Sequence, residues 1–245
     1  MDLKYKIALF LHSNRLFKKI FTPLAAFILK KLQGRANVVV FIKKDGTRVY
    51  NKKNKKIRIV FKAGARNNRV EIYEPYLISG NLTLVFEGSS NTFKLGANSR
   101  LHSLNISFGN DNTFVAGENF TVVGLKAFLI RSNGKKITIG SNCMFSFALV
   151  FRTSDAHSVY DNQTKQVLNP PDNIEIGNHV WIAANSTILK GVKIPDNCII
   201  GAQSVVNKKF DKPNCIIAGI PAGVKKENIN WSPGIDFQWE GVESE

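Results

Sequence analysis

Cysteine is scarce in this sequence, and its few cysteines follow no pairing motif. Three occur in 245 residues, at positions 143, 198 and 215, and none forms a CxxC pair. An odd number without that spacing indicates neither a disulfide framework nor a thiolate zinc site. We therefore expect the protein to work in a reducing compartment, the cytoplasm.

Long apolar runs are also absent. No run approaches the ~20 residues that a transmembrane helix requires, and the first 35 residues lack the small-residue cleavage site of a secretory signal. In this segment apolar stretches alternate with lysine and arginine, which predicts one or two basic amphipathic helices over residues 1–36. Such helices either pack on the protein or on another subunit, or lie on the inner face of an acidic membrane.

Acidic residues are few compared with basic ones. Asp and Glu number 18 against 34 Lys and Arg, which gives a formal net charge of +16. This charge favours anionic partners such as nucleic acid, acidic lipid, a phosphorylated cofactor or an acidic polymer, and does not choose among them.

From about residue 37 the sequence consists of short β-rich runs, and Asp45-Gly46 between two of them predicts a hairpin turn. Variants of one phrase then recur about every twenty residues, except that the last is delayed: NNRVEI, SNTFKLGANS, DNTFVAGENF, KKITIGSNCM and DNIEIGNHVW. Self-similarity of this period predicts a solenoid of stacked coils.

A six-residue period appears within the later coils. Because alternate side chains of an extended segment share a face, two interlocked series point inward, and Trp181 between them points outward. Three such hexads make one coil of 18 residues, and the count makes Cys143 and Cys198 core side chains rather than nucleophiles. The inward positions are Ile176, Ile182, Ile188, Ile194, Ile200 and Val206, with Val180, Ser186, Val192, Cys198 and Ser204.

The period is interrupted by the polar run TSDAHSVYDNQ. Continuing the count from Ile139 would place His157 inside the coil, among side chains too polar for a core. The sequence therefore predicts a loop excursion over residues 158–173, and loops on rigid scaffolds are where sites are usually built.

The hexads IGNHVWIAANSTILKGVKIPDNCIIGAQSVV and the following IIAGIPAGVKK resemble the hexapeptide-repeat acyltransferases. SDAHSVYD before them is similar to the O-acetyltransferases of capsular and O-antigen polysaccharides, the polysialic acid O-acetyltransferases among them. The resemblance covers roughly residues 60–232. It implies an all-β solenoid, a left-handed parallel β-helix. With the amphipathic helices predicted above, the expected organisation is an N-terminal helical segment (1–36), the β-helix (37–220) and a short C-terminal tail (221–245). The left hand comes only from the resemblance, since parallel crossovers are right-handed in about 98% of cases.

The resemblance also implies a function, namely acetyl-CoA-dependent transfer of acetyl to a hydroxyl of a bacterial surface polysaccharide or its precursor, by a homotrimer. His157 would be the general base. Asp155 either holds the imidazole tautomer or forms a turn, and Trp181 lies near the substrates or in a subunit interface. Arg152 could pair with a carboxylate of an acidic acceptor, and Tyr160 is a further candidate for acceptor contact.

Positions along the later coils match those at which the family binds coenzyme A. Small residues allow the pantetheine arm to approach, and lysines either meet its phosphates or form a solvated face. Gly223 departs from the pattern, because relatives frequently carry Arg or Lys there. The candidates are Ala184, Gly201, Ala202, Asn207, Lys208, Lys209 and Lys226.

Three alternatives remain at this stage. A γ-class carbonic anhydrase shares the fold, but its paired-His zinc spacing is missing around His102, His157 and His179, so we expect no metal. An N-acetyltransferase acting on an amino sugar nucleotide differs only in the acceptor. A non-catalytic solenoid gives no reason for SDAHSVYD. Nucleic acid is not an expected partner.

Overall fold

The computed structural model describes residues 36–129 and 132–234. The chain divides into the units Met1–Asn37 and Val38–Glu245, and the description below concerns the second. The amphipathic helices expected over residues 1–36 and the end of the predicted tail lie outside the described residues.

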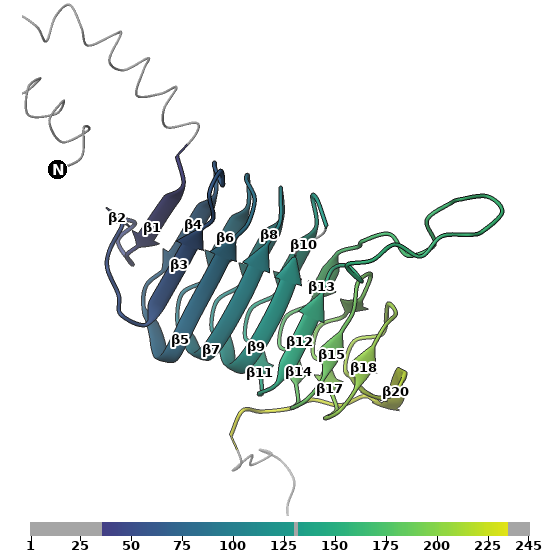
Figure 1. Ribbon diagram of the computed structural model, residues 1–245. Coiled ribbons are helices and arrows are strands. Elements are labelled where there is room, and N and C mark those ends of the chain that lie inside the picture. The colour runs from purple at the N-terminus through teal and green to yellow at the C-terminus, as the bar shows by residue number, and fades with distance from the viewer. Residues whose placement is uncertain (1–35, 130–131, 235–245) are drawn as a thin grey trace, which may run out of the picture. The chain divides into compact units, whose positions relative to one another are not determined.

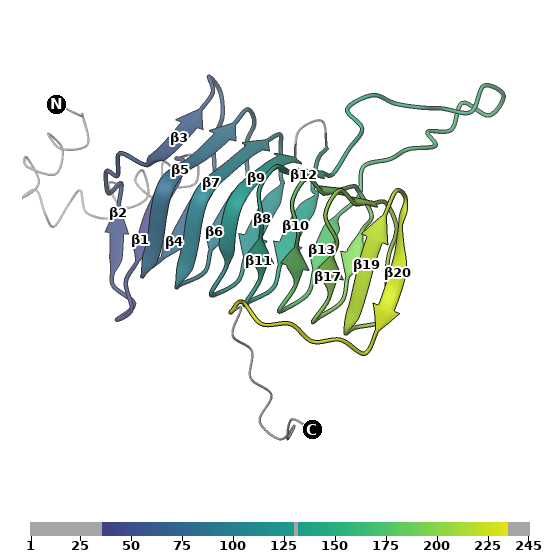
Figure 2. The same cartoon turned by 90° about the horizontal axis from the view of Figure 1, so that it is seen from below.

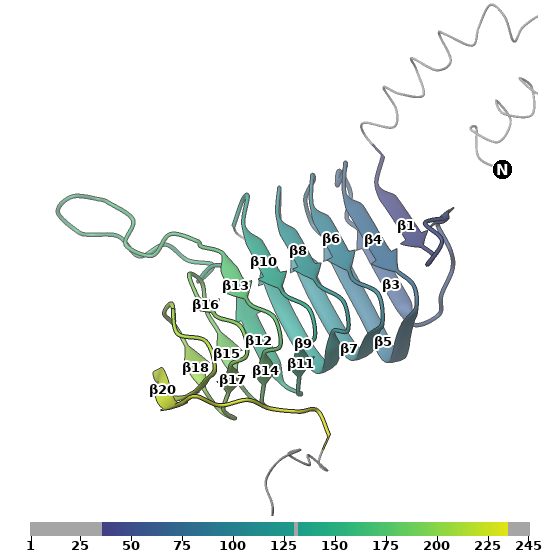
Figure 3. The ribbon, with the colours of Figure 1, turned by 180° about the vertical axis from the view of Figure 1, so that it is seen from behind.

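The described part is a parallel β-helix whose coils have three flat faces (Figure 1). The first face is an eight-stranded sheet in which all neighbours are parallel except β1 and β2. Figure 3 shows its strands side by side. They are β1 (Val38–Ile42), β2 (Arg48–Tyr50), β4 (Arg69–Tyr73), β6 (Thr92–Leu95), β8 (Thr113–Ala116), β10 (Lys136–Ile139), β13 (Ile174–Ile176) and β16 (Lys193–Ile194).

The second and third faces are joined by long bent strands. These are β5 (Tyr76–Phe86), β7 (Ser99–Phe108) and β9 (Thr121–Leu129); β9, for example, pairs with β11 through its start and with β12 through its end. The second face continues with β11 (Met144–Phe145), β14 (Trp181–Ile182), β17 (Ile199–Ile200), β19 (Cys215–Gly219) and the antiparallel β20 (Ala222–Glu227). The third contains β3 (Ile57–Phe61), β12 (Leu149–Arg152), β15 (Thr187–Ile188) and β18 (Val205–Val206).

The repeated phrases of the sequence are the strands of the first face, since β4, β6, β8, β10 and β13 stack in that order. In the later coils Ile176 pairs with Ile194 and Ile182 with Ile200, which confirms the 18-residue coil. The Asp45-Gly46 turn is confirmed as well, because β1 and β2 pair antiparallel on either side of it.

Both inward series predicted from the hexads are buried in one continuous core. Ser186 and Ser204 occupy two of these inward positions, and neither hydroxyl is buried without a hydrogen bond. Both hydroxyls donate to the carbonyl of Gly201 (3.1 and 2.7 Å). Cys143 and Cys198 are core side chains, and burial raises the pKa of the Cys143 thiol to about 11.

The coil corners require residues that tolerate left-handed backbone. At the corner between the first and second faces, asparagines and one histidine have φ between 53° and 59°. Asparagine accepts this conformation more readily than most residues. The residues are Asn98, Asn119, Asn142, His179, Asn197 and Asn214.

Candidate active site

The longest departure from the coil is the segment between β12 and β13, residues 153–173, which we call the arm. In earlier coils the same corner is closed by short loops, residues 87–91 and 109–112. The arm projects from the β-helix in Figures 1 and 3. Thr153 anchors its start, since its hydroxyl bonds to that of Ser132 (2.9 Å) and its carbonyl accepts from the N–H of Asp172 (3.0 Å).

The outer half of the arm is a small hairpin. Tyr160 forms an antiparallel bridge with Val167, and the N–H of Leu168 donates to the carbonyl of Val159 (2.7 Å). The Asp161 carboxylate accepts from the N–H groups of Thr164 and Gln163, and these bonds hold the pKa of Asp161 below its usual range. The Tyr160 side chain is exposed on this hairpin.

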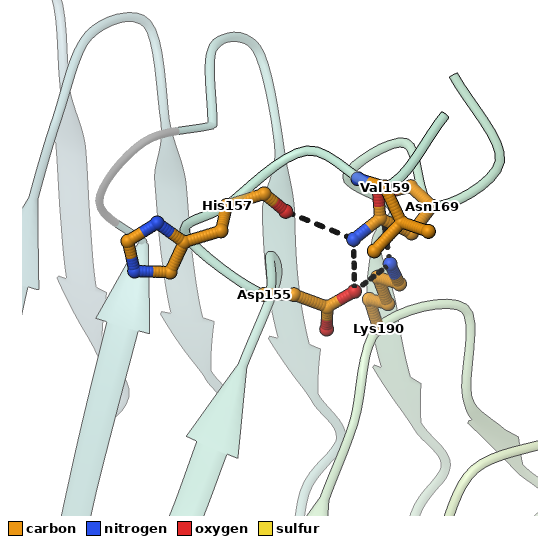
Figure 4. A network of polar contacts seen from close by, with 5 residues as sticks. All are labelled: Asp155, His157, Val159, Asn169 and Lys190. Carbon is orange, nitrogen blue, oxygen red and sulfur yellow. Dashed lines mark hydrogen bonds and ion pairs between the residues drawn. The ribbon is translucent and has the colours of Figure 1, made fainter. Parts of the chain in front are cut away.

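The base of the arm is held by a polar network (Figure 4). The carboxylate of Asp155 accepts from the Lys190 ammonium and from the side-chain amide of Asn169 (2.8 Å). These bonds, that of Lys190 above all, lower the pKa of Asp155. The hydrogen bonds of Asp155 thus go to Lys190 and Asn169, and Figure 4 shows the imidazole of His157 turned away from that carboxylate.

His157 lies at this base and is exposed. It follows Ala156, whose backbone is left-handed (φ 65°), so the chain turns sharply just before the imidazole. Arg152 ends β12 at the point where the arm leaves the third face, and its guanidinium lies 5.8 Å from the ring centroid of Phe128. An imidazole and a guanidinium therefore stand at the exit of the arm.

Trp181 begins β14 on the second face and is half-buried. Trp231, a residue that the sequence reasoning missed, packs beside it with ring centroids 6.0 Å apart. Trp231 is fixed by stacking on His179 (4.2 Å) and by donating its indole N–H to the His179 carbonyl (2.9 Å). Figure 2 shows the segment after β20, which carries Trp231, running back across the ends of the strands. The rings of His179 and Trp231, together with Asn119, Asn142 and Met144, border a cleft of about 340 Å³.

His157 and Trp181 lie at different corners of one chain. Between them the chain crosses the whole first face as β13. In the single chain, therefore, the two candidate catalytic side chains are separated by the width of a face.

The candidate coenzyme A residues fall into separate groups. Ala184, Gly201 and Ala202 share the corner between the second and third faces, where the N–H of Gln203 donates to the carbonyl of Ala184 (2.9 Å). A Cβ on Gly201 would lie 2.7 Å from the Ala218 methyl carbon, so packing alone requires glycine there.

The polar candidates lie elsewhere. Asn207, Lys208 and Lys209 follow β18 and are exposed, and Lys226 is on β20. At Gly223 an added Cβ would meet no atom within 4 Å, so the fold itself does not demand glycine at that position.

Within residues 36–129 and 132–234, no three His, Cys, Asp or Glu side chains gather to form a metal site. His102 bonds to the Ser79 hydroxyl (3.2 Å), and His179 bonds to the Asn197 amide oxygen (2.8 Å). The described residues also contain no helix suited to crossing a membrane.

Comparison with known proteins identifies the fold and the family. Residues 173–208 match the family described as bacterial transferase hexapeptide (six repeats). The chain is 35% identical over 185 residues to the polysialic acid O-acetyltransferase of Neisseria meningitidis, an alignment covering 67% of this chain and 86% of the relative.

Two solved structures share the architecture. The polySia-specific acetyltransferase NeuO superimposes with a TM-score of 0.67 at 24% identity, over 81% of this chain and 87% of its own. The polysialic acid O-acetyltransferase OatWY gives 0.61 at 28% identity, over 76% and 91%. The β-helix is therefore left-handed, as the resemblance implied. This chain belongs to the hexapeptide-repeat O-acetyltransferases and is an acetyltransferase enzyme.

Proposed function

We propose that the protein transfers acetyl from acetyl-CoA to a hydroxyl of a bacterial surface polysaccharide, with His157 as the general base. The observation that carries the proposal is an exposed histidine at the base of the arm, where the coil of an O-acetyltransferase is interrupted. The polysialic acid O-acetyltransferase of Neisseria meningitidis, to which this chain is similar, supports the class of acceptor.

The chemistry requires little beyond this arrangement. The imidazole of His157 takes the proton of the acceptor hydroxyl while that oxygen attacks the thioester carbonyl carbon. As the carbon–sulfur bond breaks, the imidazolium returns the proton to the departing thiolate, and the products are an O-acetyl ester and the free thiol. The protein needs no covalent intermediate of its own.

The active assembly in this proposal is a homotrimer with the sites between subunits. His157 and Trp181 stand at different corners of one chain, so a cyclic arrangement can place the arm of one subunit against the second face of the next. A sizing measurement with light scattering should give three chains per particle. A monomer with full turnover would contradict this part of the proposal.

The test of His157 is its replacement by alanine. We expect His157→Ala to lower turnover at least ~100-fold, the usual contribution of a general base, with an unchanged melting temperature. His102→Ala is the matched control, because His102 is also exposed but lies on β7. Near-normal turnover in folded His157→Ala would overturn the assignment.

The bond formed identifies the acceptor group. An O-acetyl product loses its acetyl group in mild alkali, whereas an amide retains it. Mass spectrometry of the acetylated glycan before and after alkali therefore tests the hydroxyl acceptor, and an alkali-resistant product would favour an amino sugar instead.

A further inference from the structure

One side chain at the base of the arm forms hydrogen bonds to three residues of the segment that leaves the coil. These three residues are Asp155, His157 and Val159, which alternate along the chain. Asn169 lies in the segment of the arm that returns to the coil. Its amide nitrogen donates to the Asp155 carboxylate (2.8 Å) and to the His157 carbonyl (2.9 Å). Its amide oxygen accepts from the N–H of Val159 (2.6 Å). Both amide hydrogens and the oxygen are thus used, and only a carboxamide supplies two donors and one acceptor here.

Lys190 ties this contact to the rigid coils. It lies in the corner after β15, one coil further along, and its ammonium donates to the Asp155 carboxylate and to the Asn169 carbonyl (2.8 Å). Its side chain is only 20% exposed, against 45% for Asp155. Lys190 therefore joins the two strands of the arm to a part of the fold that the core holds in place.

The segment that these bonds hold has an unfavourable backbone conformation. Ala156 has a φ of 65°, a left-handed conformation that is sterically unfavourable for an alanine. It lies between Asp155 and His157, the two residues that Asn169 contacts on either side of it. Without those contacts the turn can relax, and the Cα of His157 moves with it.

We infer that Asn169 and Lys190 are positioning residues for His157, which fix its backbone through the Asp155 carboxylate and the His157 carbonyl (Figure 4). The inference rests on the proposed role of His157 as the base. Neither residue touches the imidazole in this network. They affect the reaction by fixing the position of the His157 main chain. A displacement of a catalytic group by about 1 Å can lower the rate on the order of 100-fold.

The experiment is a double-mutant cycle of Asn169→Ala with His157→Ala in the full-length chain, read by release of the coenzyme A thiol. We expect Asn169→Ala alone to lower kcat about 10- to 100-fold with little change in either KM. In the His157→Ala background the same change should cost less than about twofold, because the group it positions has gone. The matched control is Asn162→Ala at the tip of the arm, where the Asn162 amide oxygen accepts from the Lys165 ammonium (3.2 Å); this variant should keep normal kcat.

Folding and cavity effects are separated by further variants. Asn169→Asp keeps the volume but removes both donors, so it should share the kcat defect. Lys190→Met should lower kcat by a smaller factor than Asn169→Ala does. In the His157→Ala background, Lys190→Met should have no further effect on kcat. Melting temperature and particle size are measured for every variant, and Lys190→Met carries the test if the Asn169 variants fail to fold.

The outcomes distinguish this inference from the proposed function. If Asn169→Ala keeps normal kcat, or lowers it by the same factor with and without His157, the positioning role is wrong while the base survives. If His157→Ala itself keeps normal turnover, the proposed base is wrong, and a positioning role falls with it.

Discussion

At the residue scale, the ion pair of Asp155 with Lys190 determines a pH dependence. The hydrogen bond from Lys190 lowers the pKa of Asp155 in the folded protein. A carboxyl group with a lowered folded-state pKa stabilises the fold at pH values above its unfolded pKa, ~3.9, and that stabilisation is lost as the pH falls through the folded value. The Asp155 carboxylate therefore stays ionised through the neutral range, and its protonation does not contribute to a rate profile above about pH 5.

The corresponding prediction concerns stability. Lys190→Met should lower the free energy of unfolding by at most about 1 kcal/mol near neutral pH, because the pair is partly exposed. The difference from the unsubstituted protein should shrink below about pH 4. Thermal melts from pH 3 to 8 measure it, with Lys165→Met as the control, since Lys165 donates to the neutral amide of Asn162. A deficit that grows in acid would show the opposite sign.

At the element scale, Gly201 in the corner between the second and third faces has two possible roles, contact with coenzyme A and packing of the coils. The family resemblance predicts that Gly201 lies along the pantetheine chain of coenzyme A. In the structure Gly201 packs against Ala218. A second substitution, Ala218→Gly, distinguishes the two roles. Removing the Ala218 methyl group relieves a packing defect caused by a larger residue at position 201, but it does not restore a lost contact with coenzyme A.

We expect Gly201→Ala to destabilise the fold by about 1–3 kcal/mol through overpacking, and Ala218→Gly to restore most of that loss in the double variant. Melting temperature reports the packing effect. KM for acetyl-CoA in the double variant reports the binding effect. Normal KM with restored stability would leave Gly201 a packing residue only, whereas a raised KM would place it beside the substrate.

At the scale of the whole molecule, the net charge of +16 exceeds what a few coenzyme A phosphates require. An acidic acceptor polymer would be attracted by this surface potential, and Arg152, which ends β12 at the exit of the arm, is the side chain that we propose for contact with its carboxylate. The alternative is that the lysines serve solubility or contact a membrane through residues 1–36. These explanations differ in how salt affects the acceptor.

The Debye length falls from about 30 Å at 0.01 M to about 8 Å at 0.15 M ionic strength. If the charge draws in the acceptor, KM for an acidic polysaccharide should rise about tenfold or more across this range at saturating acetyl-CoA. KM for a neutral sugar should stay nearly constant. Equal salt dependence for both acceptors would contradict electrostatic attraction and leave the charge to other partners.

The solenoid and the place of its interruption could both be predicted from the amino-acid sequence. A coil repeats the same burial at the same spacing, so the positions of Ile176, Ile182 and Ile188 reveal the fold without any knowledge of tertiary contacts. His157 was found because its polar neighbours break that period. The left hand required the resemblance, since the hexads specify which side chains point inward and not the direction in which the coil turns.

The residues that surround the interruption could not be predicted and became known from the folded chain. Asn169 and Lys190 lie 12 and 33 residues from His157, and Trp231 reaches His179 from beyond the coils. No period connects such positions, because an irregular arm and a returning tail choose their partners by geometry rather than by spacing. The carboxylate of Asp155 could be assigned to an imidazole or to a turn from the sequence, and it was the folding of the arm onto the next coil that gave it Lys190.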